Sequence, residues 1–149
     1  MRRHRVIQWS TGNVGKLALK AIIERPDLEL VGLWVHGQDK VGRDAGELCG
    51  LPPCGIKATS DADALLKLDA DCVSYTATGD LRPAEAVDDM CRMLEAGKNV
   101  VSTSVVSLIY PPAADPKSVA KLEAACKRGN TSCFTSGIDP GFANDALPI

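Results

Sequence analysis

Three small residues at fixed spacing, Ser10, Gly12 and Gly15, could form a turn that binds a phosphate group. They lie in the segment WSTGNVGK, which follows a short apolar run and opens an amphipathic one. Aligned with the pattern G-x-G-x-x-G, the segment has serine in place of the first glycine and glycine at the other two glycine positions. A side chain at the second position would block a pyrophosphate, and the third is where the helix packs on the strand.

This spacing predicts a dinucleotide-binding turn, because a helix that begins at a small-residue turn offers free amide groups and the positive end of its dipole to an anion. The serine can still turn, and its hydroxyl can donate to a phosphate oxygen. The residues expected to contact the pyrophosphate are Ser10, Thr11, Gly12, Asn13, Val14 and Gly15. The alternative is a tight turn that binds nothing.

The end of the second expected strand should distinguish between the two forms of the cofactor. An Asp or Glu there would bind the 2′-hydroxyl of the adenosine ribose in NAD. The sequence LWVHGQDK has His36 at the strand end instead, followed by Lys40 and Arg43. Positive groups suit a 2′-phosphate, so NADP is favoured over NAD. Two alternatives stay open: the charges are ordinary solvated loop residues, or Asp39 serves NAD. A catalytic base is not expected at His36, which lies at the adenosine end.

A third group of small residues ends the fourth expected strand, in the segment YTATGD. Small side chains there would let the chain pass over the second ribose and the nicotinamide. The residues expected to contact this part of the cofactor are Thr76, Ala77, Thr78 and Gly79. A strand end followed by a turn accounts for them equally well.

These segments need a sheet and helices to position them. Continuous apolar runs predict strands at 5–9, 28–35, 56–59, 71–78, 99–106 and 131–137. Apolar residues at helical spacing predict helices around 14–22, 61–68, 83–96 and 116–128, with one helical turn near 45–49 and Ser60 or Asp61 capping the second helix. Strands that alternate with helices predict an α/β fold of the Rossmann type, a doubly wound parallel sheet with helices on both faces.

Composition limits the function classes. The chain has 149 residues, of which 45% are apolar, which suits one domain. Its 17 basic and 19 acidic residues give a net charge of −2, so neither nucleic acid nor an anionic membrane surface is an expected partner. No apolar run is long enough to span a bilayer or to form a signal-peptide core, which favours a cytoplasmic protein.

Six cysteines and two histidines could suggest a disulfide framework or a metal site. No two of the cysteines are spaced as C-x-x-C, and three of them fall inside apolar segments: Cys72, Cys91 and Cys133. Reduced, structural thiols are therefore the favoured interpretation, and no metal is expected.

Five segments together resemble a known family. They are STGNVGKLALKAI, GRDAGELCGLP, YTATGD, AGKNVVSTS and GIDPGF, and they cover essentially the whole chain. The chain resembles the amino-terminal domain of dihydrodipicolinate reductase-like proteins, and within them the group that contains 2,4-diaminopentanoate dehydrogenase and related NAD(P)H-dependent amine dehydrogenases. The resemblance implies a nicotinamide cofactor and hydride transfer at a C–N centre, in an imine or an amine, or at a carbonyl.

The resemblance also implies what lies beyond this chain. Residues 1–138 are expected to form the NAD(P)-binding domain, and residues 139–149 to begin the connection to a second domain for substrate binding and homo-oligomer formation. Catalytic His and Lys residues of the reductases are expected in that second domain. The chain alone should therefore bind the nucleotide and turn over little.

One departure concerns catalysis. In the amine dehydrogenases a glutamate is expected just after the fifth strand, where this chain has Val105 and Val106. The remaining polar candidates are Thr103, Ser104 and Asp139, each more typical of a loop residue that binds the backbone. The catalytic residues are therefore unassigned. Two alternatives to an oxidoreductase stay open: a non-catalytic nucleotide-binding or redox-sensing module, and a doubly wound domain that binds no dinucleotide.

Overall fold

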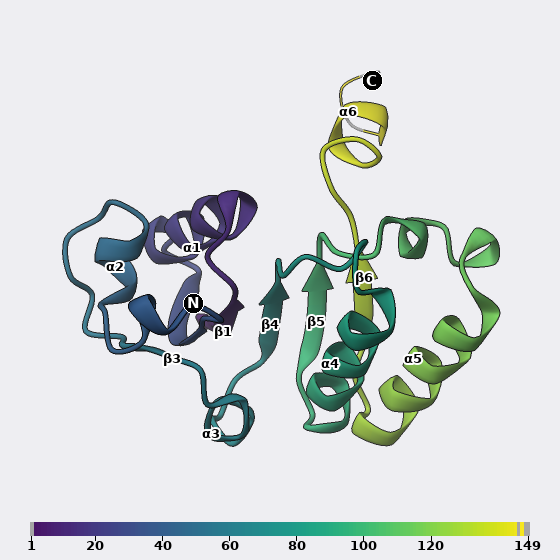
Figure 1. Ribbon diagram of the computed structural model, residues 1–149, viewed down its shortest axis with the longest axis horizontal. Coiled ribbons are helices and arrows are strands. Elements are labelled where there is room, and N and C mark those ends of the chain that lie inside the picture. Colours follow the sequence, from purple (N-terminus) through teal and green to yellow (C-terminus); the bar gives the residue numbers. More distant parts are fainter. Residues whose placement is uncertain (1, 146, 148–149) are drawn as a thin grey trace. The chain divides into compact units, whose positions relative to one another are not determined.

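The computed structural model describes residues 2–145 and residue 147. The chain divides into two compact units, Met1–Ala77 and Thr78–Ile149. Both are built from parallel strands connected by helices (Figure 1).

The first unit is a four-stranded parallel sheet in the order β3-β2-β1-β4. Its strands are β1 (His4–Trp9), β2 (Leu28–Trp34), β3 (Ala58–Thr59) and β4 (Cys72–Tyr75). Its helices are α1 (Asn13–Glu24), the 3₁₀ helix η1 (Gln38–Lys40), α2 (Ala45–Leu48) and α3 (Ala62–Leu66).

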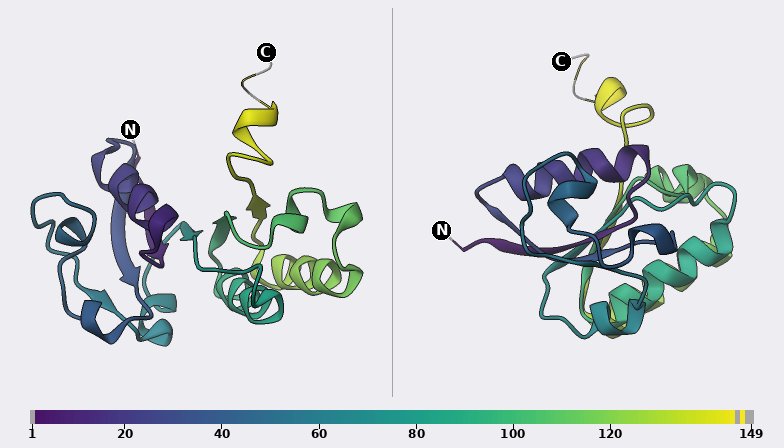
Figure 2. Two further views of the ribbon diagram at one scale, coloured as in Figure 1. Left: turned by 45° about the horizontal axis from the view of Figure 1, so that its top comes forward. Right: turned by 60° about the vertical axis from the view of Figure 1, so that its left-hand side comes forward.

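Helices cover both faces of this sheet because successive residues of β2 point to opposite sides. Leu33 is buried in a cluster with Leu19 of α1 and Leu48 of α2. Gly32, its neighbour, faces α3, and a Cβ atom there would lie 2.6 Å from Leu65 Cδ2. Two views of the ribbon show α1 and α2 side by side (Figure 1, Figure 2). Glycine at position 32 therefore lets α3 pack closely on the sheet.

The second unit contains two parallel strands and the helices that pack on them. The strands are β5 (Asn99–Ser102) and β6 (Cys133–Thr135). The helices are α4 (Pro83–Glu95), α5 (Pro116–Gly129), α6 (Phe142–Asp145) and the 3₁₀ helices η2 (Val106–Ile109) and η3 (Pro111–Ala113). Helices α4 and α5 pack on one another, and α4 also packs on β5 (Figure 1).

The predicted fold class is confirmed: the structure is a Rossmann-type α/β fold with six parallel strands and helices. Each of the six strands and five helices or helical turns expected from the sequence is present, and Asp61 caps α3 by accepting a hydrogen bond from Ala64 N at 2.9 Å. The short 3₁₀ helices and α6 are additions that the apolar periodicity did not predict.

Several predicted boundaries were wrong. The strand predicted at 99–106 ends at Ser102, because Val105 adopts a left-handed backbone conformation (φ +58°) and η2 follows it. The strands predicted at 56–59, 71–78 and 131–137 are likewise shorter. Helix α5 includes Gly129, and Asn130, not the glycine, takes the left-handed conformation that ends it (φ +52°).

Candidate functional site

The predicted phosphate turn lies between β1 and α1 in the first unit. Helix α1 begins at Asn13, with Gly12 as its N-cap. Glycine is not needed at position 12 for internal packing, since a Cβ atom there would meet no other atom within 4 Å. Its φ of −69° is open to any residue. The structure thus gives no packing reason for glycine at this position.

Gly15 has the opposite environment. A Cβ atom there would clash with the carbonyl oxygen of Ser10 and would lie 2.8 Å from Thr76 Oγ1. This glycine is buried and brings α1 against the ends of β1 and β4. Gly15 therefore packs the helix on the sheet as the spacing predicted, whereas the role of Gly12 beside a pyrophosphate stays a prediction.

The surface of the turn is open at the start of α1. Gly12, Asn13 and Val14 are exposed, whereas the side chain of Thr11 is buried. The first amide groups of a helix have no acceptor within the helix, and the dipole adds partial positive charge at that end. With no acidic residue in the first turn of α1 to oppose an anion, this end of the helix is electrostatically suited to a phosphate.

Of the three predicted basic residues, the structure brings Lys40 to the turn. Its Nζ lies 3.2 Å from Thr11 Oγ1 and 3.4 Å from Thr11 O. Arg43 is exposed one turn further on, and its backbone is fixed by bonds from Arg43 N to Lys40 O (3.1 Å) and from Ala58 N to Arg43 O (2.9 Å). An ammonium group thus stands beside the predicted pyrophosphate site.

His36 is exposed after the end of β2 and lies beside Trp34, with the ring centroids 6.2 Å apart. Trp34 in turn stacks on Trp9 at 4.9 Å with an interplanar angle of 7°. Asp39, the residue considered for NAD, has an exposed side chain that folds back over Gly37. The strand end therefore carries an aromatic stack and an imidazole, with a carboxylate close by.

Thr76 and Ala77 are the other residues of the first unit that the sequence predicted to contact the cofactor. Thr76 Oγ1 donates to Trp9 O at 2.9 Å and accepts from Gln8 Nε2 at 2.8 Å, so its hydroxyl joins β4 to β1. Ala77 is buried. The structure thus places Thr76 beneath the predicted phosphate turn, against Gly15.

Thr78 and Gly79 belong to the second unit. Thr78 is exposed. Gly79 packs on the loop after β5, where a Cβ atom would lie 2.8 Å from Ser104 Cβ and 3.0 Å from Val105 N. Asp80 strengthens this contact, since its Oδ1 accepts from Val106 N at 3.0 Å. Close packing between these two loops accounts for glycine at position 79.

Comparison with known proteins agrees with this geometry. A family model described as dihydrodipicolinate reductase, N-terminus, matches residues 6–104. The chain belongs to this family. An amine dehydrogenase of Streptomyces virginiae is 43% identical over 144 residues, which is 96% of this chain and 40% of that protein. A 4-hydroxy-tetrahydrodipicolinate reductase of Synechocystis is 33% identical over 149 residues, which covers 95% of this chain and 48% of the reductase.

Among solved structures, an amine dehydrogenase from Mycobacterium smegmatis superposes with a TM-score of 0.81 at 24% identity, over 91% of this chain and 40% of that one. The chain therefore spans less than half the length of these relatives. Membership confirms the resemblance seen in the sequence and the expected NAD(P)-binding domain of oxidoreductases.

The sequence did not reveal the role of Asp44, a residue in the first unit of this chain. Asp44, whose side chain is buried, caps α2 and accepts backbone hydrogen bonds from Gly46 N (2.9 Å), Cys54 N (2.8 Å) and Gly55 N (2.9 Å). These bonds, led by the one from Cys54, lower the pKa of its carboxyl to about 2. Asp44 therefore fixes the loop that follows Lys40 and Arg43. An aspartate directly before a short helical segment is the signal that could have revealed it.

The loop after β5 contains no carboxylate of its own. Val105 is buried there, and Ser104 N donates to Ser102 Oγ at 2.9 Å, which makes Ser104 part of a local turn. Thr103 and Asp139 are exposed. None of these observations assigns a catalytic residue.

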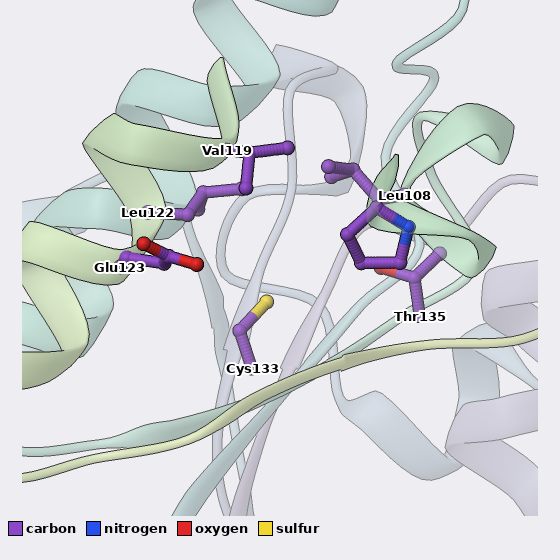
Figure 3. Close-up of a pocket in the computed structure, with 7 residues that line it drawn as sticks. Leu108, Val119, Leu122, Glu123, Cys133 and Thr135 are labelled. Atoms are coloured by element: carbon purple, nitrogen blue, oxygen red, sulfur yellow. The ribbon is translucent and has the colours of Figure 1, made fainter. Parts of the chain in front are cut away.

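The second unit also has a small, mainly apolar hollow of about 130 Å³ between α5, β6 and the η2–η3 segment (Figure 3). Its lining residues are Leu108, Pro111, Val119, Leu122, Glu123, Cys133 and Thr135. None of the residues predicted to bind the cofactor lines it.

Within residues 2–145 and 147, no helix has the length and apolar character needed to cross a membrane, and no group of three or more His, Cys, Asp or Glu side chains could hold a metal ion. Among the described residues, none of the six cysteines forms a disulfide; Cys91 is buried and Cys54 is exposed.

Proposed function

We propose that this chain is the NAD(P)H-binding part of an oxidoreductase that acts on a C–N centre, in an imine or an amine, or on a carbonyl. The observation that carries the proposal is the pair of glycines in the turn: Gly12 faces open space at the start of α1, while Gly15 packs α1 onto the sheet. A nicotinamide cofactor would supply hydride donor or acceptor chemistry, and this chain would bind and orient it.

The proposed cofactor contacts are the residues predicted from the sequence. The open turn 10–15 would bind the pyrophosphate, and His36, Lys40 and Arg43 the adenosine end. Thr76, Ala77, Thr78 and Gly79 would lie along the second ribose and the nicotinamide. Contact of Lys40 Nζ with Thr11 supports this arrangement, because it puts a cation at the turn that is proposed to bind the phosphates.

NADP is the proposed preference over NAD. An acidic residue at the end of β2 would favour the ribose hydroxyl, but the sequence there continues with His36. Lys40 and Arg43 follow on a segment that is hydrogen-bonded to β3. Both side chains are cationic and suit the extra phosphate of NADP.

The substrate class is proposed from the relatives. One is named an amine dehydrogenase and the other a 4-hydroxy-tetrahydrodipicolinate reductase. A small amine, imine or carbonyl compound is therefore the proposed substrate, bound mainly by a second domain that would begin near residue 139 and form a homo-oligomer. A protein without that domain is expected to bind the nucleotide and to turn over little.

Calorimetric titration of this chain with NADPH and NADH, side by side, tests the proposal. We expect saturable binding of both, with NADPH binding roughly tenfold more tightly, the ratio that one charge-assisted contact can supply. Equal affinity for the two would refute the NADP preference. Absence of binding by either would refute the proposed function.

A non-catalytic nucleotide-binding module is the second candidate. It is favoured by the valines at 105 and 106, where the family resemblance implied a glutamate, and by the buried position of Val105. The two candidates differ in one result. A longer natural form of the chain that oxidises NADPH with an imine or carbonyl substrate is an enzyme, whereas one that binds NADPH without turnover is a module.

A further inference from the structure

Ser10 has an unusual backbone conformation for its residue type. Its φ is +83°, in the left-handed region that favours glycine. Only two other described residues that are not glycine have positive φ, Val105 and Asn130. Asparagine adopts this conformation readily, whereas serine does so less often. Ser10 stands where the pattern G-x-G-x-x-G has its first glycine, so the turn keeps the shape that glycine would give it without the glycine.

The side chain of Gln8 is positioned to hold that shape. Gln8 is fully buried two residues before the turn. Its Nε2 donates to the carbonyl oxygen of Ser10 at 2.9 Å and to Thr76 Oγ1 at 2.8 Å. The two good donor contacts match the two hydrogens of the amide group. Its Oε1 has no hydrogen-bond partner among the described residues, so the nitrogen alone carries the interaction.

The Ser10 carbonyl also determines where α1 can lie. A Cβ atom on Gly15 would clash with that oxygen, so α1 rests directly on it. The preceding peptide, between Trp9 and Ser10, is fixed as well, because Ser10 N donates to Trp34 O at 2.9 Å. Rotation of the Ser10 carbonyl would therefore move the start of the helix, where the proposed pyrophosphate contacts are.

We propose that Gln8 is the positioning residue of the phosphate turn. Its amide group holds Ser10 in the left-handed conformation that glycine would adopt at this position. Gln8 thereby affects the affinity for the dinucleotide without contacting the dinucleotide. The part that concerns affinity rests on the proposed function. The coupling between Gln8 and Ser10 does not.

A double-mutant cycle tests the coupling. Gln8→Met keeps the length of the side chain and removes the donor, and Ser10→Gly removes the need for it. In the Ser10 background we expect Gln8→Met to weaken NADPH binding about tenfold in calorimetric titration. In the Ser10→Gly background the same change is expected to alter the affinity less than twofold. An equal loss in both backgrounds, or no loss in either, overturns the proposal.

Thermal denaturation of wild type, the two single variants and the double variant gives a second result that does not depend on the ligand. We expect Gln8→Met to lower the midpoint by about 5 °C in the Ser10 background and by less than half of that in the Ser10→Gly background. If wild type does not bind NADPH, the proposed function fails, and these midpoints alone decide whether Gln8 and Ser10 are coupled. Equal shifts in the two backgrounds refute the coupling.

Failure of Gln8→Met to fold would also be informative. Recovery of folding in Gln8→Met/Ser10→Gly is the rescue that the proposal requires. If neither protein folds, Gln8 supports the core independently of Ser10 and the proposal is wrong. Thr76→Val is the matched comparison: it removes the other acceptor of the Gln8 amide, and its effect should not be rescued by Ser10→Gly.

Discussion

The ammonium group of Lys40 lies 3.2 Å from the hydroxyl of Thr11, although 29 residues separate them along the chain. This contact joins the loop after β2 to the turn between β1 and α1. It brings the basic loop after β2 next to the predicted phosphate turn. In the sequence, these two features were linked only through the expected position of a cofactor.

Replacing Lys40 with methionine should weaken NADPH binding roughly tenfold, because a charge-assisted contact to a phosphate is lost. NADH binding should weaken less if Lys40 binds the 2′-phosphate, and equally if it binds the pyrophosphate. Calorimetric titration with both nucleotides measures the two ratios. Lys67→Met, which removes an exposed lysine at the end of α3, is the matched control. If both variants have the same small effect, Lys40 has no specific role.

Gly12→Val and Gly15→Val should separate binding from folding. Position 12 has open space around it and an ordinary φ, so valine there should leave the thermal midpoint within a few degrees of wild type while NADPH binding is lost. At position 15 the new side chain would clash with Ser10 O, and the fold itself should be destabilised by more than about 2 kcal/mol. Unchanged affinity in Gly12→Val would place the pyrophosphate elsewhere.

Asp44 should make stability depend on pH in the acid range. Its pKa is lowered from 3.8 to about 2 in the folded protein, so the ionised form is bound better in the folded state than in the unfolded one. The resulting stabilisation is complete above pH 4 and is lost as the pH falls through 2. Thermal midpoints of wild type and Asp44→Asn measured from pH 7 to pH 2 should therefore converge at low pH. A constant difference across that range would contradict this role.

Asn130 should affect the stability of the fold through its backbone conformation. It ends α5 at a φ of +52°, with its N–H donating to Cys126 O. Asn130→Gly should preserve or slightly raise stability, whereas Asn130→Val should lower it by about 1–2 kcal/mol, since a β-branched residue resists this conformation. Urea denaturation of the two variants measures the difference. Equal stabilities would mean that the left-handed conformation is not maintained in solution.

Much of the fold could be predicted from the sequence because the strands are continuous apolar runs and the helices have regular apolar spacing. The end of β5 could not, since Val105 and Val106 read as strand residues while tertiary packing against Gly79 and Asp80 turns the chain there. Local propensity does not record such long-range contacts.

The candidate site was predicted in part. The packing of Gly15 against the Ser10 carbonyl follows from the spacing, because it is steric, and the phosphate role of Gly12 stays a prediction. Gln8 was taken for one residue of an apolar strand, since nothing in a single sequence shows that its amide group bonds to the Ser10 carbonyl. The approach of Lys40 to Thr11 depends on a loop that is fixed by long-range backbone bonds to β3, from Gly42 N to Ala58 O and from Ala58 N to Arg43 O, and local spacing does not encode these bonds.

The most direct test of the central claim is nuclear magnetic resonance titration of the ¹⁵N-labelled chain with NADPH. We predict that the largest amide shifts fall on Thr11 to Gly15, at the start of α1, with further shifts near Lys40. Shifts that are absent from these amides, or that cluster at the apolar hollow between α5 and β6, would contradict the assignment of the dinucleotide site.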